Sequence, residues 1–295
     1  MITHNGATYK VVVVTPAGRE EYLSFFKKYI YAEMDRGLVD GWQLWQNTIK
    51  QSDIAYLASM EAENPKVNRF FISNIVPNGP EFNSADTMRS CEFFKNCHDD
   101  DTIYIRFDDD IVWYEPGAIE KMCLARIEHP DELFIYPNII NSTTVTAWHQ
   151  KKGVLGLEVG KVRQQEEKPE DPHWAYLDEF NYSDSKLIDL IHDTFKKNYE
   201  AGTLGEYYLP SKTLSNYEHF SICSVAWWGK DKLDPTGHAE EPWVSWEEPE
   251  RRKRPNYFVG DALMVHYAYH TQRPYLKKCG PEKLEFYKQL SESHA

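Results

Sequence analysis

The chain has 295 residues, of which 41% are hydrophobic and 27% charged, a balance typical of a folded protein with a substantial core rather than of a disordered chain. The formal net charge of −13 argues against a nucleic-acid-binding protein and against attachment to anionic lipid, because both need a broad basic surface. Five cysteines without a Cys-x-x-Cys pair indicate reduced thiols. Since the sequence shows no signal-peptide pattern and no apolar stretch of about 18 residues, we expect a cytoplasmic protein without a transmembrane segment.

From residue 10 to residue 140, short apolar runs alternate with amphipathic segments. Runs such as Val11 to Val14 predict buried strands, whereas apolar residues at helical spacing, such as Phe25, Phe26 and Tyr29, predict helices. Strict alternation with short connections predicts a mostly parallel sheet flanked by helices. The predicted strands span residues 10–15, 42–45, 69–76, 102–107 and 133–140, and the predicted helices span 20–33, 51–62, 84–94 and 116–126.

Beyond residue 141 the alternation is less regular. A Gly-, Glu- and Lys-rich stretch predicts a surface loop over residues 153–172. An apolar segment covers 220–229, a polar segment covers 231–254, a strand-like run covers 256–269, and helices are predicted over 184–198 and 282–290. Because no repeat and no clear linker divides the chain, we predict a single domain over residues 1–295.

Three consecutive carboxylates, Asp108, Asp109 and Asp110, follow the predicted strand 102–107. If the backbone stays extended, Asp108 and Asp110 face the same way. Right-handed crossovers place the ends of the first, second and fourth strands on one edge of the sheet, where α/β folds bind ligands. Divalent cations bound by few carboxylates usually bridge to substrate phosphates, so the triplet predicts a Mg²⁺ or Mn²⁺ site for a phosphorylated substrate. The alternative is a solvated acidic turn.

Further motifs follow the triplet in a fixed order: a Trp-Trp-Gly run at 227–229, the acidic pair Glu240-Glu241, and His266 in a strand-like run. This order, over nearly the whole chain, resembles the GT-A fold of nucleotide-sugar-dependent glycosyltransferases, with the triplet as the Asp-x-Asp motif. One departure is that Glu241 stands where many members have Asp. The resemblance does not place the chain in a particular glycosyltransferase family.

The resemblance implies an α/β fold with a nucleotide-sugar-binding half over residues 1–141 and a smaller acceptor-binding half over 142–295. It implies a nucleotide-sugar donor, a carbohydrate acceptor and Mn²⁺ or Mg²⁺ as the cofactor, which neutralises the leaving diphosphate as a Lewis acid. In an inverting enzyme, a carboxylate also deprotonates the acceptor hydroxyl. The donor sugar, the base of the nucleotide, the stereochemical outcome and the oligomeric state stay open.

The residues that the resemblance assigns fall into four groups. The metal ligands are Asp108, Asp110 and His266, with His270 as a rival ligand. The catalytic base is Glu241, with Glu240, Asp231 and Asp234 as second choices. The donor-binding residues are Thr15, Pro16, Arg19, Asn47, Thr48, Arg89, Asp108 and Asp109, with Asp109 the most dispensable member of the triplet. The acceptor-binding residues are Trp227, Trp228, Gly229 and Trp243.

Each assignment has a structural alternative. His266 fits a hydrogen-bonded core histidine, the pair Glu240-Glu241 fits the first turn of a helix, and the tryptophans fit a core. At the level of function, the triplet also fits a haloacid-dehalogenase-like phosphatase, in which Asp108 is the nucleophile. However, Val265 stands where that family needs a second acidic residue after Gly260-Asp261. A third hypothesis is a non-catalytic glycan-binding module on a transferase fold.

Overall fold

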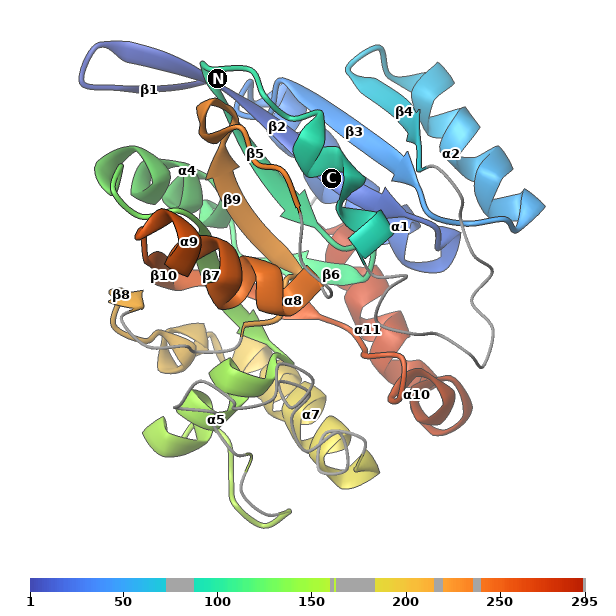
Figure 1. The fold of residues 1–295 in the computed structure, drawn as a ribbon. Helices are drawn as coiled ribbons and strands as arrows, with labels where there is room; N and C mark the ends of the chain where they lie inside the picture. The colour runs from blue at the N-terminus through green and yellow to red at the C-terminus, as the bar shows by residue number, and fades with distance from the viewer. Residues whose placement is uncertain (73–87, 160–161, 163–183, 215–219, 236–239, 294–295) are drawn as a thin grey trace.

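The computed structural model describes residues 1–72, 88–159, 162, 184–214, 220–235 and 240–293, without the side chains of residues 88–90. In this part of the chain, ten strands form one mixed sheet (Figure 1). Its main path runs in the order β4 (Val67–Phe71), β3 (Gly41–Gln46), β2 (Ala7–Ala17), β5 (Thr102–Phe107), β9 (Ser224–Trp228), β7 (Ile135–Ile140), β10 (Asn256–His266) and β6 (Ile111–Tyr114). Off this path, β1 (Ile2–His4) pairs with β2, and β8 (Lys212–Leu214) pairs with β10.

Most strands of the sheet run in the same direction. Strand β2 is parallel to β3 and β5, β3 is parallel to β4, and β10 is parallel to β7. Strands β5 and β7 are both antiparallel to β9, so they too share a direction. The predicted α/β fold, with a mostly parallel sheet flanked by helices, is therefore confirmed.

Helices cover both faces of the sheet. They are α1 (Glu20–Asp35), α2 (Gln51–Glu63), α4 (Ala118–Glu128), α5 (Thr143–Lys152), α7 (Ser185–Ala201), α8 (Glu240–Pro242), α9 (Glu248–Arg252), α10 (Arg273–Cys279) and α11 (Pro281–Glu292), with 3₁₀ turns η1 (Met88–Lys95), η3 (Leu204–Tyr207) and η4 (Gly229–Asp231) and a π-helical turn η5 (Trp243–Glu247). In Figure 1, α8 and α9 lie in front of the sheet, and α1 and α11 lie behind it.

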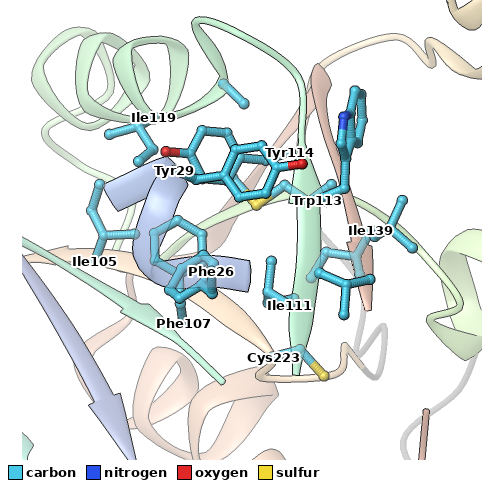
Figure 2. Packing of buried hydrophobic residues seen from close by; sticks show 14 of the residues in the cluster. Phe26, Tyr29, Ile105, Phe107, Ile111, Trp113, Tyr114, Ile119, Ile139 and Cys223 are labelled. Carbon is cyan, nitrogen blue, oxygen red and sulfur yellow. The ribbon is translucent and has the colours of Figure 1, made fainter. Parts of the chain in front are cut away.

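Alternating side chains of β5 divide the core between the two faces. Ile103, Ile105 and Phe107 join the cluster that contains α1, where Phe26 lies 5.2 Å from Phe107 between ring centroids (Figure 2). Tyr104 joins the cluster on the other face. Both faces of β5 are therefore buried, which holds the residues that follow the strand in place.

Most predicted elements are found, although two expectations need correction. The described part of the segment predicted as a helix over 84–94 is the 3₁₀ turn η1, in which Cys91 and Phe94, three residues apart, are both buried. The polar segment 231–254 contains α8, η5 and α9. Of these, the sequence suggested only the start of α8, as the structural alternative for Glu240-Glu241. Residues 73–76 of the third predicted strand, and most of the loop predicted over 153–172, lie outside the described residues. None of the described helices is both long and apolar enough to span a membrane.

Candidate functional site

The loops after β2 and β3 contact each other at the edge where these parallel strands end. The backbone N–H of Asn47 donates to the carbonyl of Ala17 at 2.7 Å. A side chain at Gly18 would meet the carbonyl oxygen of Asn47 at 2.6 Å. Glycine at position 18 therefore allows the two loops to meet, and the chain turns there toward the acidic triplet.

The acidic triplet forms a turn rather than an extension of β5. The N–H of Ile111 donates to the carbonyl of Asp108 at 3.2 Å, so the side chains of Asp108 and Asp110 point to different partners. The condition under which these two carboxylates would face the same way, an extended backbone, is therefore not met. Asp110 also anchors β10 through its carbonyl, which accepts from the N–H of Tyr267 at 2.9 Å.

Asp109, which we expected to be the most dispensable of the three, is buried, and both of its carboxylate oxygens accept hydrogen bonds. Its carboxylate accepts from the N–H of Gly18 at 2.8 Å and from Nε of Arg19 at 2.7 Å. Burial raises the pKa of Asp109 to about 6, while Arg19 acts in the opposite direction. Asp109 therefore positions the loop after β2, where the donor nucleoside is predicted to bind.

Three cationic or potentially cationic side chains converge on one oxygen of the buried Asp110. Its Oδ2 lies 3.0 Å from Nη1 of Arg19, 2.9 Å from Nη2 of Arg273 and 3.4 Å from Nε2 of His266. The other oxygen, Oδ1, is buried and has no hydrogen-bond partner among the described residues. Burial would raise the pKa of Asp110, but Arg19 and His266 lower it below its ordinary value, so this carboxylate is anionic.

His266 stands at the end of β10, where its Nδ1 lies 3.2 Å from the carbonyl oxygen of Asn141. Burial would lower the pKa of His266, but Cys223 and Asp110 raise it well above its ordinary value. The structure therefore brings His266 to Asp110, as the sequence predicted. The rival His270 is exposed.

Asp108 belongs to a second ionic group, which also contains the acidic pair. Arg106 donates from Nε and Nη2 to Oδ1 of Asp108 at 2.9 and 2.7 Å, and its Nη1 contacts Oε1 of Glu240. Arg106 and Glu240 are both buried. Arg106 thus joins the end of β5 to the start of α8, and it brings the acidic pair to the edge of the sheet that carries the triplet.

Glu241 differs from its neighbour in exposure and in charge environment. Glu240 is buried against Arg106, whereas Glu241 is only partly buried. Burial raises the pKa of Glu241 to about 7, and the nearby charges of Glu240 and Asp108 add to this effect. A carboxylate with such a pKa accepts a proton readily near neutral pH.

The donor types around Asp110 suit a divalent cation, but the carboxylates are held by cations of the protein. Asp110 offers a buried free oxygen and His266 an imidazole nitrogen, and both are ordinary Mn²⁺ ligands. The third predicted ligand, Asp108, is turned toward Arg106. Accordingly, no group of three or more His, Cys, Asp or Glu side chains among the described residues is arranged to hold a metal ion.

The other predicted donor-binding residues differ in how far their side chains are exposed. Thr15 is fully buried and accepts from the indole Nε1 of Trp42 at 2.9 Å, and Pro16 is buried within β2. Asn47 is exposed and Thr48 partly buried at the end of β3. Arg89 lies in η1, and its side chain is outside the described ones.

Several predicted residues lie away from the triplet. Because β9 is antiparallel to β5, its carboxyl end lies beside Ile103, at the far edge of the sheet from the triplet. Asp231 follows there and pairs with Arg254 at 2.6 Å, so it is not brought to the acidic pair. Trp227, Trp228, Gly229 and Trp243 are buried in the core rather than open to an acceptor.

The sequence analysis missed three residues of the site. Arg106 looked like one polar position in an apolar strand, and Arg273 lay outside every predicted element. Cys223 lies beside the triplet, where its carbonyl accepts from the N–H of Asp108 at 2.8 Å. For Arg106, an arginine within a buried strand two residues before a carboxylate was a usable signal.

The site and fold define an α/β protein with a cluster of charged side chains at one edge of its sheet. No protein-family model matches the chain, and no curated protein matches it. Solved structures that resemble it include a mycobacterial protein, with 11% identity over 95% of this chain and 75% of that one and a TM-score of 0.47. CMP:2-keto-3-deoxy-manno-octonic acid synthetase in complex with CTP has 9% identity over 98% and 100% of the two chains, with a TM-score of 0.45.

A third similar structure is glucosyl-3-phosphoglycerate synthase from Mycobacterium tuberculosis in complex with phosphoglyceric acid. It has 12% identity over 95% of this chain and 80% of that one, with a TM-score of 0.45. The same synthase, in complex with Mn²⁺, UDP and phosphoglyceric acid, has a TM-score of 0.33 and 13% identity over 76% and 90% of the chains. All of these TM-scores are below 0.5, so the resemblance assigns no function to this chain.

Proposed function

We propose that this protein is a metal-dependent glycosyltransferase, which moves a sugar from a nucleoside diphosphate sugar to a hydroxyl group of a carbohydrate acceptor. The observation that supports this most is the link through Arg106. It joins the carboxylate turn after β5 to the acidic pair on α8, so groups suited to a diphosphate and a candidate base share one edge of the sheet.

The leaving group of such a reaction is a nucleoside diphosphate, which gains negative charge as the anomeric bond breaks. Arg19 and Arg273 are 30% and 34% exposed at their side chains, so both can reach a phosphate from the site. Guanidinium groups bind phosphate oxygens in bidentate geometry. A bound Mn²⁺ or Mg²⁺, with Asp108, Asp110 and His266 as the proposed ligands, would supply further Lewis-acid neutralisation.

Glu241 is the proposed general base. It takes the proton from the acceptor hydroxyl, the acceptor oxygen bonds to the anomeric carbon, and the bond from that carbon to the phosphate oxygen breaks with its electron pair on the diphosphate. Because the acceptor attacks from the side opposite the leaving diphosphate, this reaction inverts the anomeric centre. Glu240 is less suited to the role because its carboxylate is held by Arg106.

A thermal-shift screen of nucleoside diphosphates with and without Mn²⁺ tests the proposal. We expect stabilisation that requires metal and diphosphate together, since a ligand that binds only the folded state raises its stability. Incubation of the matching nucleotide sugars with simple saccharides should then release the nucleoside diphosphate. Release of inorganic phosphate from small phosphomonoesters would instead support the phosphatase hypothesis. Glycan binding without turnover would support the non-catalytic module.

A further inference from the structure

Residues 220–223 lie between the acidic pair and the carboxylate turn and contact both. The carboxylate of Glu241 accepts a hydrogen bond from the backbone N–H of Ile222. One residue further on, the carbonyl of Cys223 accepts from the N–H of Asp108 at 2.8 Å. This short segment therefore sets where the proposed base lies relative to the turn that follows β5.

The N–H of Ile222 can bind a side chain because this segment is not part of the sheet. Ile222 and Cys223 form a turn, and the paired residues of β9 begin at Ser224. Ile222 is buried, and a buried N–H outside a ladder needs another acceptor. The Glu241 carboxylate is that acceptor. Donation by an N–H stabilises the anionic form of a carboxyl group, so the position of this peptide group affects how readily Glu241 takes a proton.

Ser245, in η5, holds the start of the segment. Its buried hydroxyl accepts from the N–H of Phe220 and donates to the carbonyl of the same residue, each at 3.2 Å. The ring of Phe220 also packs on Tyr136, with 4.9 Å between ring centroids, but apolar contacts do not fix the direction of the backbone. The peptide group that carries the Phe220 carbonyl is directly before the one that donates to Glu241.

The backbone of Ser245 is itself anchored. The buried Asn256, at the start of β10, donates from Nδ2 to the carbonyls of Val244 and Ser245 at 3.1 and 3.0 Å. Its Oδ1 accepts from the N–H of Phe134 at 3.3 Å. Single π-helical turns of this kind are frequent at functional sites. Ser245 therefore holds Phe220 from a position that β10 fixes.

We infer that Ser245 positions the proposed base: by holding the backbone of Phe220, it keeps the N–H of Ile222 on the carboxylate of Glu241. Ser245 acts through the backbone and is therefore a positioning residue. The inference rests on the proposed function only where it names Glu241 as the base, because the hydrogen bonds that carry it do not depend on turnover.

Other groups around Glu241 also act on its charge. Burial is the main cause of its raised pKa; Glu240, in α8, and Asp108, after β5, raise the pKa further, whereas Arg106, in β5, lowers it. Tyr136, from β7, is neutral, because burial raises the pKa of its hydroxyl and Glu241 adds to that effect. Removal of the Ser245 hydroxyl leaves all of these charges in place. A change in the pKa of Glu241 would therefore report on the hydrogen bond from Ile222.

Carbon-13 NMR of protein labelled at the glutamate carboxyl carbon measures the pKa of Glu241 without any substrate, and its signal is the one that disappears in Glu241→Gln. In Ser245→Ala we expect this pKa to rise from about 7 by about one pH unit, because loss of a hydrogen bond to the charged form favours protonation by an amount of this order. Ser245→Thr retains the hydroxyl and should restore most of the original value.

Ser224→Ala is the matched control. It removes a buried hydroxyl that has no hydrogen-bond partner among the described residues, so the pKa of Glu241 should not move. Circular dichroism melting shows that each variant is folded before titration. A purely structural role of Ser245 would lower the melting temperature but would leave the pKa of Glu241 unchanged.

A second measurement needs no change at position 245. Ser221-Ile222 is the only Ser-Ile pair in the sequence, so serine labelled with ¹³C at the carbonyl and isoleucine labelled with ¹⁵N isolate the amide signal of Ile222. This signal should titrate with the same midpoint as Glu241, and the titration should vanish in Glu241→Gln. An Ile222 signal that does not follow Glu241 overturns the inference even if Ser245→Ala does not fold.

The outcomes distinguish this inference from the proposed function. If the pKa of Glu241 is the same in folded Ser245→Ala as in the unmodified protein, the inference is wrong and the proposed function stands. The proposed function fails separately, if the protein turns over no nucleotide sugar or if Glu241→Gln keeps full turnover. In that case, a shifted pKa in Ser245→Ala would still support the positioning of Glu241 by Ser245.

Discussion

Glu240 and Glu241 are adjacent in the sequence but differ in burial and in pKa. Glu240 is buried on Arg106, whereas Glu241 is partly buried and has a pKa raised to about 7. Two identical side chains therefore have different environments: Glu240 balances the charge of Arg106, whereas Glu241 is the residue that we propose as the general base.

Substitution of Glu241 by Gln should lower the turnover number by about 10²-fold, which is a usual effect of removing a general base. The affinity for the nucleoside diphosphate should stay unchanged, because the amide has the same shape. Steady-state kinetics and calorimetry measure the two quantities. Asp100→Asn, at an exposed position outside every proposed role, is the control. A turnover number unchanged in Glu241→Gln would remove Glu241 from the role of base.

The pH dependence of the reaction follows from the same side chain. A general base must be deprotonated to act, so the turnover number should rise with pH and reach half of its maximum near pH 7, where Glu241 titrates. Below that pH the protonated form accumulates and the rate falls. A pH profile from about 5.5 to 8.5 shows this limb, which should be absent from the residual activity of Glu241→Gln. A profile of the same shape in the variant contradicts the assignment.

The candidate site was predicted from sequence where the signal was local. A carboxylate triplet after an apolar run, an acidic pair and a histidine in a strand are visible without a structure, and Asp110 and His266 do meet. Arg273 was missed because its role depends on a partner far along the chain: it is separated from Asp110 by 163 residues. No short-range pattern reports such a pairing.

At the scale of elements, the loops after β2 and β3 depend on the missing side chain of Gly18. Its φ is not positive, so glycine is required here for space and not for backbone conformation. The carbonyl of Asn47 belongs to the backbone and cannot rotate away from an added methyl group. The two loops would have to separate.

Gly18→Ala should therefore lower the free energy of unfolding by about 1–3 kcal/mol, the usual cost of overpacking, and should also weaken diphosphate binding, because the same turn leads into Arg19. Urea unfolding and calorimetry measure these effects. Gly205→Ala is a matched control, since its new methyl group would meet only the ring of Tyr208 at ordinary contact distance, 3.8 Å. Full stability and binding in Gly18→Ala would show that the loops adjust freely.

The elements themselves were predicted as far as local periodicity determines them. Helix α1 was expected over 20–33 and spans Glu20–Asp35, and the strand expected over 102–107 is β5. The partner of β5 was not predictable in the same way, because β9 is a short apolar run whose direction depends on the route of the chain before it. Nor was the turn at Asp108, where a continued strand was expected to align two carboxylates.

At the scale of the whole molecule, the two edges of the sheet differ in their charged groups. The carboxyl ends of β2, β3 and β5 carry the charged site, whereas the opposite edge carries Asp231, which pairs with Arg254. Arg254 in turn donates to the carbonyls of Pro130 and Glu132, which close this edge. Asp231 therefore pairs with a cation of this edge and not with the groups of the charged site.

Asp231→Asn should lower the free energy of unfolding by about 1–3 kcal/mol, the value of a hydrogen bond between charged groups. The turnover number of the folded protein should not change, because the site lies at the other edge. Thermal unfolding and steady-state kinetics separate the two effects. A large loss of turnover without a loss of stability would return Asp231 to the candidates for the base.

The position of β9 also has a consequence for the biosynthesis of the protein. On the ribosome, β5 and β7 are made long before residues 224–228, which separate them in the finished sheet. Until then, the nascent chain has two strands with unpaired edges and no native partner between them, a condition that favours misassociation. Folding of the central sheet is therefore expected to finish only after most of the chain has been synthesised, and proteins truncated before β9 should depend on chaperones to stay in solution.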